Sequence, residues 1–514
     1  AATGAELYVG HGTVWVNGDN GYIAMQVSGL EVLPGGGLTD SGMHLLIVED
    51  DVGFVDEIKQ VIEDLQVDVN CFFAKSRDEA YSAIDEKHLD YVILDLKIPT
   101  KNEALDEEPE HGLSVFTRSR SALPGVPILV LTGSSAENFI PIMLNEQQQV
   151  DIWSQGQTFG TVDFLKKIDF EKLPEKIQVV YQAIDSLSEV EVDRGTVALS
   201  LAEQRILRIF AKKFGGVFCK IIQLGGGLSG AKVLRVKVTD TSGALIHNAV
   251  AKIGSMAEIQ DEARRFDIHV SRLRPEATPR KLATIEFGGG ALAGVFYGLA
   301  DGYDKSVLDV LQDAPQFSDK VVEAIKNTTR QWGEGVPSTR RNISEIRRRL
   351  LSDRTYEKLK GGYDLSFLRR MENREYQVRW PCVHGDLHVY NSLISDFDSA
   401  VLIDYGDVEY GPASLDPLTL ELSLIFHPET ILDASWPTIR QARLWGDLDA
   451  YLEDCPYEVY VRSCRRWAEE VSAGKREILV VAYSYLLRQL KYEDTNKELA
   501  LALLDGVMKS FEKT

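Results

Sequence analysis

Two sets of residues in this sequence have the side chains that phosphoryl transfer requires. The first set lies in the first half and follows short apolar runs: Glu49, Asp50, Asp95, Thr132 and Lys167. Clustered carboxylates repel one another and need a cation, and their hard oxygen atoms suit Mg²⁺. Such a site could accept a phosphoryl group, because the metal and Lys167 neutralise the developing charge and Asp95 supplies the nucleophile.

The second set begins with a glycine-rich stretch that fits G-x-G-x-x-G. We expect five of its residues to bind nucleotide, namely Gly225, Gly226, Gly227, Ser229 and Gly230. Taken alone, the glycines could form an ordinary hairpin turn. Residues 231–238 alternate like a strand, whereas a dinucleotide-binding motif opens a helix. A further strand carries Lys252, which is the order found in protein kinases, where this lysine holds the α- and β-phosphates. Glu262, in the helical run 258–270, could pair with Lys252.

Three more polar residues lie in two short motifs of the second half. Asp386 and Asn391 are five positions apart in HGDLHVYN, and Asp404 lies in IDYGD. Phosphoryl transfer from ATP needs one carboxylate that orients the acceptor hydroxyl and takes its proton. It also needs an amide and a second carboxylate that hold Mg²⁺ on the β- and γ-phosphates. The two motifs therefore contain the residue types of a kinase site.

The elements expected around these residues follow from the apolar pattern. Apolar runs at 45–48, 91–94 and 128–131 each end in polar residues and lead into a helical stretch, which is typical of a parallel sheet covered on both faces. The carboxyl ends of such strands share one rim, where ligands bind. Strands follow from Val217 and helices from about Asp304, which favours a two-lobed unit.

The first half resembles the receiver domain of two-component response regulators, because LLIVEDD, YVILDL, VLTGSS and DFLKK match that domain in order and spacing. The resemblance implies that Asp95 is the phosphoacceptor. It also implies that Glu49 and Asp50 form the acidic pair, and that Asp50 and Asp95 bind Mg²⁺. Thr132 and Lys167 would contact the phosphoryl group.

Three features depart from the usual receiver pattern. Ile168 follows the lysine where the family usually has a proline, and segments 99–111 and 134–160 are longer than usual. Both segments border the expected switching face, to which Phe164 would contribute the switch aromatic. We therefore expect these segments to contact the kinase-like unit and to transmit a signal to it.

The second half resembles the aminoglycoside phosphotransferase and choline kinase group, which shares the protein-kinase-like fold. HGDLHVYN is similar to the group's H-G-D-x-x-x-x-N, and IDYGD to its I-D-[FYW]-x-D. The resemblance implies ATP as the nucleotide and Asp386 as the catalytic base, with Lys252 and Glu262 completing the catalytic set. It further implies that Asn391 and Asp404 are Mg²⁺ ligands.

We therefore expect a multidomain fold of α/β and α+β character. The expected parts are a β-rich segment and linker at 1–42, a flavodoxin-like receiver with a parallel sheet at 43–190, a connecting helix at 191–215, a kinase-like N-lobe at 216–303 and a helical kinase-like C-lobe at 304–514. Gly/Asn turns between short β-prone runs in the first part predict hairpin strands.

The composition of the chain disfavours several classes of protein: general nucleic-acid binders, membrane proteins, and disulfide-bonded or zinc-binding proteins. The 514 residues include 56 Lys+Arg and 78 Asp+Glu, a net charge of −22, so we expect no general binding to nucleic acid or to an anionic membrane. No apolar run approaches the roughly 18 to 20 residues of a membrane-spanning helix. The five cysteines are widely spread without a C-x-x-C pair, which disfavours disulfides and zinc and favours a cytoplasmic location.

Two functions stay open on this basis. In the first, a sensor histidine kinase or another phosphodonor phosphorylates Asp95, and the kinase-like unit transfers the γ-phosphoryl group of ATP to an unknown hydroxyl acceptor. In the second, the kinase-like unit is a pseudokinase that binds nucleotide or a partner as a signalling scaffold. A homodimer formed through the receiver is compatible with both. A DNA-binding regulator is disfavoured, because the second half has no helix-turn-helix pattern.

Overall fold

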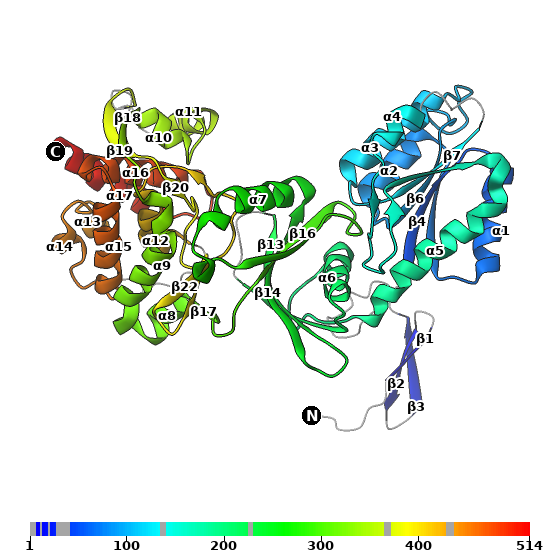
Figure 1. The fold of residues 1–514 in the computed structure, drawn as a ribbon, viewed down its shortest axis with the longest axis horizontal. Helices are drawn as coiled ribbons and strands as arrows, with labels where there is room; N and C mark the ends of the chain where they lie inside the picture. Colours follow the sequence, from blue (N-terminus) through cyan, green and yellow to red (C-terminus); the bar gives the residue numbers. More distant parts are fainter. Residues whose placement is uncertain are drawn as a thin grey trace. The chain divides into compact units, whose positions relative to one another are not determined.

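The computed structural model describes residues 7–10, 13–18, 21–26, 42–133, 140–224, 230–363, 372–427 and 436–514. The chain divides into two compact units, Ala1–Ser41 and Gly42–Thr514. The first unit contains an antiparallel sheet of β1 (Leu7–Gly10), β2 (Thr13–Gly18) and β3 (Gly21–Gln26), drawn in dark blue in Figure 1. The β-rich start expected from the sequence is therefore confirmed.

The second unit begins with a five-stranded sheet in which every strand is parallel to its neighbours, in the order β5-β4-β6-β7-β10. The strands are β4 (Met43–Val48), β5 (Val69–Ala74), β6 (Tyr91–Asp95), β7 (Ile128–Thr132) and β10 (Val162–Lys166). The helices are α1 (Val52–Leu65), α2 (Arg77–Glu86), α3 (Pro109–Ala122), α4 (Ile140–Leu144) and α5 (Leu173–Asp185). This strand order is that of the flavodoxin-like fold, which confirms the predicted class.

Residues of β4 alternate between two apolar cores, which explains why the whole strand is buried. Leu45 and Ile47 point to the face covered by α1 and α5, and Leu46 and Val48 point to the face covered by α2 and α3. Figure 1 shows the two helical layers on either side of the sheet. Successive side chains of a strand point to opposite faces, so a continuous apolar run is the expected pattern of a strand covered on both.

The short hairpin of β8 (Gln149–Val150) and β9 (Phe159–Gly160) precedes β10.

An amphipathic helix, α6 (Leu201–Lys213), packs between this sheet and the next, and in the chain it joins β11 (Glu191–Asp193) to β12 (Phe218–Gln223), which both belong to the next sheet. Ser200 and Glu203 form a capping box at its start, which satisfies backbone N–H groups that otherwise lack partners. On the buried side of the helix, the Phe210 ring stacks on that of Phe296 at a centroid distance of 3.8 Å. Apolar residues of the receiver sheet, of α6 and of the following sheet form one continuous core. The predicted connecting helix thus packs against both neighbours.

Backbone hydrogen bonds also join the receiver region to the next sheet. Gly125 N donates to Gly290 O at 3.0 Å, and Gly288 N donates to Gly125 O at 2.9 Å. A Cβ atom on Gly288 would lie 3.4 Å from Ile152, which belongs to the long segment after Thr132. The described hydrogen bonds of segment 99–111 stay within the receiver region. Of the two long segments expected to make this contact, the second therefore lies against the next sheet among the described residues.

The third region is a six-stranded sheet with the order β11-β12-β13-β14-β16-β15. Its strands are β11 (Glu191–Asp193), β12 (Phe218–Gln223), β13 (Lys232–Thr239), β14 (Leu245–Ser255), β15 (Arg280–Ile285) and β16 (Leu292–Gly298). Helix α7 (Met256–Ile268) follows β14 and packs against β16. This sheet and its one long helix form the smaller lobe of the two-lobed unit.

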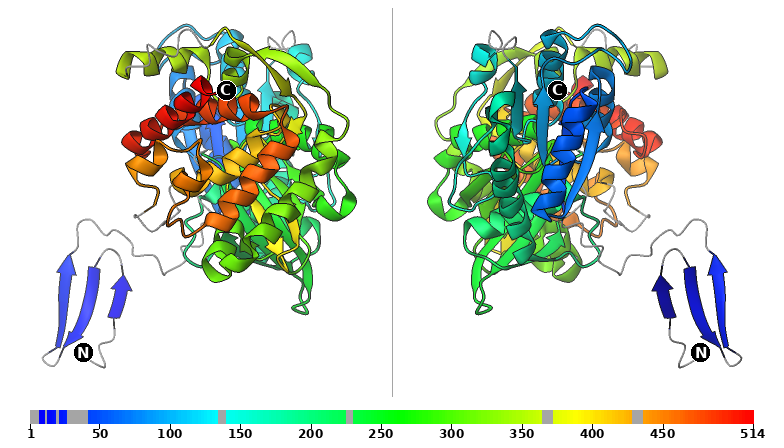
Figure 2. Two further views of the ribbon diagram at one scale, coloured as in Figure 1. Left: turned by 90° about the vertical axis from the view of Figure 1, so that its left-hand side faces the viewer. Right: turned by 90° about the vertical axis from the view of Figure 1, so that its right-hand side faces the viewer.

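The larger lobe is mainly helical. Its helices are α8 (Val307–Asp313), α9 (Ser318–Gly333), α10 (Ile343–Arg348), α11 (Asp353–Gly362), α12 (Leu415–Phe426), α13 (Ile439–Ala442), α14 (Leu448–Tyr451), α15 (Glu458–Val471), α16 (Lys475–Gln489) and α17 (Lys497–Glu512). Its strands are β17 (Lys305–Ser306), β18 (Ser338–Asn342), β19 (Glu375–Arg379), β20 (Cys382–Val383), β21 (Ser392–Ser395), β22 (Ser399–Leu402) and β23 (Glu409–Tyr410). The orange and red helices α15 to α17 lie side by side in the left view of Figure 2. The predicted order of strands followed by helices is confirmed.

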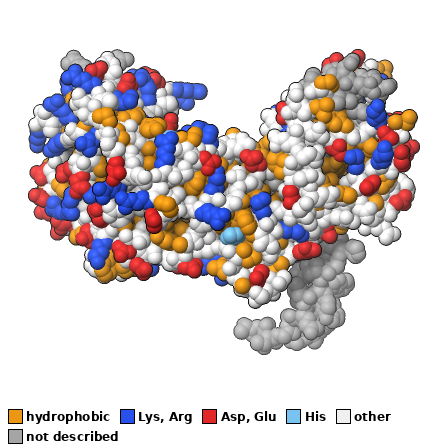
Figure 3. Space-filling model, in the orientation of Figure 1, with side chains coloured by type: hydrophobic (Ala, Val, Ile, Leu, Met, Phe, Trp, Pro, Cys, Tyr) orange, Lys and Arg blue, Asp and Glu red, His pale blue; other side chains and the backbone are white. Residues whose placement is uncertain are grey.

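The surface carries both signs of charge. On the face drawn in Figure 3, basic and acidic side chains are intermixed over the described residues. Arg340, Arg341 and Arg347–Arg349 form a local basic tract in the larger lobe. Within it, Arg347 is only 2% exposed and pairs with Glu372 and Asp353 at 2.9 and 2.6 Å. Part of that tract therefore serves internal ion pairs. No helix among the described residues combines the length and the apolar character needed to cross a membrane.

Candidate functional site

The acidic residues predicted to hold Mg²⁺ meet at the carboxyl ends of the receiver strands. Glu49 and Asp50 follow β4, and Asp95 is the last residue of β6. One oxygen atom from each of the three carboxylates lies within 4.8 Å of the other two. Lys167, which follows β10, places its Nζ 2.8 Å from Glu49 Oε2 and 2.8 Å from Asp95 Oδ2. The structure thus brings these four predicted residues together.

Crowding and burial shape the electrostatics of this rim. Glu49 is 1% exposed, and burial together with the nearby Asp95 charge raises the pKa of Glu49 to about 7. Burial also raises the pKa of Asp50. Although burial alone would lower it, the pKa of Lys167 is raised by Asp95 and Glu49. One lysine serves two carboxylates next to a third, and oxygen ligands of this kind fit a hard divalent cation.

Local structure fixes the position of these side chains. Asp51 caps α1 by accepting hydrogen bonds from Gly53 N and Phe54 N at 2.8 and 3.2 Å, so the acidic residues lie between a strand end and a helix start. On the other side, α3 approaches so closely that a Cβ atom on Gly112 would overlap the backbone of Leu96. Close packing on both sides limits how far the rim can relax.

Thr132, Phe164 and Ile168 belong to β7, to β10 and to the segment that follows β10. Thr132 ends β7 and pairs with Lys166 of β10, but its side chain lies outside the described residues. Ile168 is 87% exposed, so an apolar side chain projects into solvent directly beside Lys167. Phe164 is partly buried and packs against the core under α2 and α3.

In the two-lobed unit, Lys252 lies between two carboxylates. It belongs to β14, and its Nζ lies 2.8 Å from Glu262 Oε2 of α7 and 2.5 Å from Asp404 Oδ1. Glu262 is 1% exposed and also accepts a hydrogen bond from Tyr297 Oη at 3.3 Å. Although burial alone would lower it, the pKa of Lys252 is raised by Glu262 and Asp404. The lysine therefore stays charged and links the two lobes.

The loop that carries Asp386 and Asn391 is held by buried hydrogen bonds. Asp416, at the start of α12, accepts from His384 N and Gly385 N at 2.8 and 2.9 Å. Asn391 Nδ2 donates to the Asp386 carbonyl oxygen at 2.8 Å. Gly385 has φ +85°, and a Cβ there would lie 2.5 Å from the Asp407 carbonyl oxygen. A glycine is required at this position, because the backbone is left-handed and another chain segment lies against it.

The β21–β22 hairpin aligns this loop with Asp404. Ser392 pairs with Leu402, and Ile403 N donates to Asn391 O at 3.1 Å. Asp404 itself has φ +63°, an uncommon backbone conformation for a residue other than glycine. The structure therefore brings Lys252, Glu262, Asp404, Asn391 and Asp386 to one region between the two lobes.

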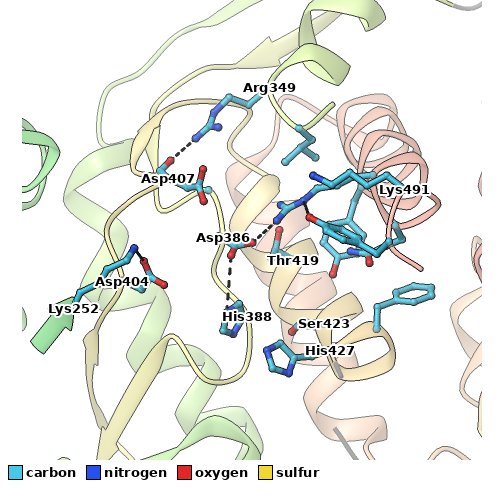
Figure 4. A pocket seen from close by; sticks show the side chains of 17 residues that line it. Lys252, Arg349, Asp386, His388, Asp404, Asp407, Thr419, Ser423, His427 and Lys491 are labelled. Carbon is cyan, nitrogen blue, oxygen red and sulfur yellow. Dashed lines mark hydrogen bonds and ion pairs between the residues drawn. The ribbon is translucent and has the colours of Figure 1, made fainter. Parts of the chain in front are cut away.

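Of these five residues, Lys252, Asp386 and Asp404 line a cavity of about 380 Å³. In Figure 4, Lys252 and Asp404 lie toward one end, Asp386 lies between, and Lys491 lies at the opposite end. His388 also lines the cavity; burial lowers its pKa to about 4 although Asp386 opposes the shift, so its ring is neutral near pH 7. The size lies within the range of small-molecule sites, about 300 to 1,000 Å³.

Arg488 is a residue of this cavity that sequence reasoning missed. Its Nη2 donates to Asp386 Oδ1 at 2.9 Å, and its Nε donates to Tyr492 Oη at 3.1 Å. Burial would raise the pKa of Asp386, but Arg488 holds it below its ordinary value. The signal in the sequence is an arginine that directly follows the largely apolar run ILVVAYSYLL of α16. Arg349, from the basic tract, also lines the cavity and donates to Asp407 O at 2.5 Å.

Most of the predicted glycine loop lies outside the described residues, namely Gly225, Gly226, Gly227 and Ser229. Gly230 is described, and no atom outside its own neighbourhood comes within 4 Å of a Cβ built on it. The strands on either side, β12 and β13, pair in antiparallel fashion, so the stretch connects two strands as predicted.

Comparison with known proteins gives one family-model match. Residues 45–178 match the response regulator receiver domain. One curated relative, the transcriptional regulatory protein MalR of Bacillus subtilis (strain 168), is 25% identical over 158 residues, which are 29% of this chain. The match spans 58% of that relative's length. The class defined by strand order, acidic rim and family model is thus a receiver domain for this part of the chain.

Solved structures similar to the chain fall into two groups. A CheY-like receiver domain protein from Methanospirillum hungatei JF-1 is 21% identical, with coverage of 27% of this chain and 98% of that one and a TM-score of 0.20. The receiver domain of a sensor histidine kinase from Pseudomonas aeruginosa PAO1, with a magnesium ion in its active-site cleft, is 18% identical, with coverage of 28% and 98% and a TM-score of 0.20. The second group includes aminoglycoside phosphotransferase APH(4)-Ia in a ternary complex with ADP and hygromycin B. It is 12% identical, with coverage of 59% and 98% and a TM-score of 0.35.

Proposed function

We propose that this protein is a receiver-regulated phosphotransferase. A phosphodonor such as a sensor histidine kinase phosphorylates Asp95, and the two-lobed unit transfers the γ-phosphoryl group of ATP to a hydroxyl acceptor. The observation that carries the proposal is the arrangement in the interlobe cavity. Lys252 is paired with Glu262 and Asp404 at 2.8 and 2.5 Å, and Asp386 lines the same cavity.

Each residue of the cavity has a role in the transfer. Lys252, oriented by Glu262, binds the α- and β-phosphates of ATP, and Asp386 orients the acceptor hydroxyl and takes its proton. The acceptor oxygen forms a bond to the γ-phosphorus while the bond from that phosphorus to the bridging oxygen of ADP breaks. Mg²⁺, when bound by Asp404 and Asn391, neutralises charge on the phosphates. The Asn391 side chain has its amide nitrogen committed to the Asp386 carbonyl oxygen, which leaves its oxygen for a metal.

The receiver site performs a simpler transfer. Asp95 carboxylate oxygen attacks the phosphorus of the donor, the bond from phosphorus to the donor breaks, and an acyl phosphate forms. Lys167 already lies 2.8 Å from Asp95 and stabilises the added negative charge. Glu49, Asp50 and Asp95 supply the oxygen ligands for Mg²⁺, which lowers the repulsion between the incoming phosphoryl group and the carboxylates. Thr132, at the end of the neighbouring strand, would contact the phosphoryl oxygens.

ATP consumption tests the second transfer. Purified full-length protein should turn over ATP with Mg²⁺ when the correct hydroxyl compound is present, and Asp386→Asn should remove that turnover while leaving ATP affinity within about twofold, because the base does not contact the nucleotide. Lys252→Met should instead lose ATP binding. Turnover that survives in Asp386→Asn would overturn the assignment of this residue.

The Arg488–Asp386 ion pair also favours a second function, a nucleotide-binding scaffold. The ion pair at 2.9 Å engages Asp386 Oδ1, so Arg488 competes with an acceptor hydroxyl for this carboxylate. A scaffold would bind Mg²⁺-ATP, gain thermal stability by mass action and show no turnover with any acceptor. ATP binding without turnover across hydroxyl compounds of every charge class would therefore replace the enzyme by the scaffold.

A further inference from the structure

The cavity has two ends of different composition. Lys252 and Asp404, the proposed nucleotide and metal residues, lie toward one end in Figure 4. The rest of the lining includes Thr419, Ser423 and His427, in and directly after α12, and Arg488 and Lys491, at and just after the end of α16; Lys491 lies at the opposite end of the cavity in Figure 4. If the nucleotide occupies the first end, this second end receives the acceptor.

The acceptor end carries positive charge. Arg488 and Lys491 are cations, and none of the described residues that line this end beyond Asp386 is acidic. Asp386 is the one carboxylate close to them, and Arg488 already neutralises it at 2.9 Å. Among the interactions between described residues, Lys491 Nζ has its ring contact with Tyr492, 4.6 Å from the centroid, and no carboxylate partner. One cation therefore remains there without a counter-charge.

Arg488 has the capacity to bind a second anion. A guanidinium group carries five N–H donors in a planar fork. Two of its nitrogens, Nε and Nη2, are used by Tyr492 and Asp386, and Nη1 makes no hydrogen bond to a described residue. The Arg488 side chain is 16% exposed, so it is withdrawn from bulk water but reaches the cavity. Partial desolvation strengthens the attraction of such a group for a phosphate or a carboxylate.

We propose that the acceptor is a small anionic hydroxyl compound, whose phosphate or carboxylate group binds Arg488 and Lys491. This inference rests on the proposed transfer and adds the chemical class of its substrate. Cationic acceptors are rejected, because the acceptor end holds two cations and its carboxylate is already paired. The anion shares Arg488 with Asp386, so its arrival loosens the ion pair and leaves the Asp386 oxygen open to the acceptor hydroxyl.

Inorganic phosphate is the first probe, used with full-length protein that has been saturated with Mg²⁺ and a non-hydrolysable ATP analogue so that the nucleotide end is filled. Titration calorimetry should detect phosphate binding to the wild type. Arg488→Met should weaken it by about tenfold or more, Arg488→Lys by less, and Lys491→Met by several-fold, in keeping with the strength of charge-assisted hydrogen bonds. Lys509→Met, at an exposed ion pair on α17, is the matched control and should bind like the wild type.

A matched set of acceptors extends the test to substrate class. Glycerol, glycerol 3-phosphate, glycerate and choline present similar hydroxyl groups with no charge, a phosphate, a carboxylate or a cation. Binding to the nucleotide-loaded protein should be detected for the two anionic compounds only. Equal phosphate affinity in wild type and Lys491→Met, or choline binding more tightly than glycerol 3-phosphate, would overturn the inference, even if Arg488→Met failed to fold. If the wild type failed to bind the ATP analogue at all, that result would instead reject the proposed function.

Discussion

Lys252 lies between two carboxylates, and the three side chains depend on one another. Glu262 is nearly fully buried, and Lys252 is 8% exposed. A buried ion pair contributes little relative to an apolar pair, but removal of one partner leaves an uncompensated charge and costs about 3–5 kcal/mol. A substitution of Lys252 should therefore change both the free energy of unfolding and the affinity for nucleotide, and the two can be measured separately.

We expect Lys252→Met to lower the free energy of unfolding by about 3 kcal/mol, because Glu262 and Asp404 lose the cation they share. The double variant Lys252→Met/Glu262→Gln should recover part of that loss, since the buried charge is removed with its partner. ATP affinity should remain lost in both. Urea denaturation and calorimetry measure the two quantities, and a double variant no more stable than the single one would contradict the account.

Sequence motifs predicted which residues meet around Lys252 better than which residues line the proposed acceptor end of the cavity. Asp386 and Asn391 lie in one motif with fixed spacing, and Lys252 follows a glycine-rich stretch, so their grouping could be inferred. Arg488 comes from α16, 102 positions after Asp386, and no local pattern connects the two. Only the packing of α16 beside the loop that carries Asp386 brings its guanidinium group to the carboxylate.

Among the elements, α3 and β6 make the closest backbone approach near the receiver site. Gly112 N donates to Leu96 O at 3.1 Å, one residue after Asp95. A side chain at position 112 would therefore push α3 away from the strand that carries Asp95, the proposed phosphoacceptor. Such overpacking typically costs about 1–3 kcal/mol.

We predict that Gly112→Ala lowers the free energy of unfolding by about 2 kcal/mol and slows phosphorylation of Asp95, because the strand end and the loop after it must shift. Gly133→Ala is the control on the same rim, since a Cβ there meets nothing within 4 Å. Denaturation curves and the rate of labelling by a small-molecule phosphodonor provide the readouts. Similar curves for both variants would show that the close approach has no consequence.

Element types followed from the apolar pattern where it is pronounced. The continuous apolar runs of β4, β6 and β7 predicted buried parallel strands, and the amphipathic pattern predicted α6 over 198–213 where the helix spans Leu201–Lys213. Strands β18 and β19, which are as long as β6 and β7, escaped prediction. STRRN has no apolar residue and EYQVR has only Tyr376 and Val378, and the pairing of Ser338 with Arg379 depends on tertiary contacts.

At the scale of the whole unit from Gly42 to Thr514, a buried ionic cluster joins the receiver region to α6. Asp90 lies 3.4 Å from Arg205 Nη2 and 3.2 Å from His88 Nε2, and it accepts from His44 N at 2.9 Å. Although burial alone would raise it, the pKa of Asp90 is held well below its ordinary value of 3.8 by His44, His88 and Arg205.

We expect Asp90→Asn to destabilise the protein by about 3–5 kcal/mol at pH 7, because Arg205 becomes a buried charge without a partner. A carboxyl whose pKa is lower in the folded state stabilises the fold above its unfolded pKa and loses that effect as pH falls. The difference between wild type and variant should stay constant from pH 8 to about 5 and shrink below about 4. Asp85→Asn, at an exposed pair with Arg118, should change stability by less than about 1 kcal/mol. A difference that grows toward acid pH would contradict the sign.

The contacts of Gly125 and Asp90 with the region after the receiver lead to a prediction about signalling. Asp90 lies just before the start of β6, and Gly125 lies shortly before the start of β7. Asp95 and Thr132 end the same two strands, so a signal from the proposed phosphoacceptor must travel the length of the strands. Beryllofluoride with Mg²⁺, which mimics the phosphoryl group, should change ATP affinity by about fivefold or more, and ATP should change affinity for the mimic by the same factor. Asp95→Asn should abolish both effects.

A substitution at Gly125, where the receiver region contacts Gly290, tests the coupling of the two sites separately from binding at each site. A Cβ atom on Gly125 would lie 2.8 Å from Gly290 O and 2.9 Å from Glu286 O, so Gly125→Ala must loosen this contact. We expect this variant to bind ATP and the mimic with wild-type affinity when each is alone and to lose the mutual effect. Equal ATP affinity with and without the mimic in the wild type would show that the two sites act independently.

The continuous apolar core of the receiver sheet, α6 and the smaller lobe has a consequence for how such a protein could arise and be altered. Domains joined by a tether can be exchanged between genes as separate pieces, since each keeps its own interior. Here Phe210 and its neighbours on α6 are covered from the lobe side, while the same core extends to Leu45 and Ile47 under the receiver helices. A foreign receiver spliced at residue 190 would have to reproduce that surface, so the regulatory and kinase-like parts are expected to be inherited and recombined as one block.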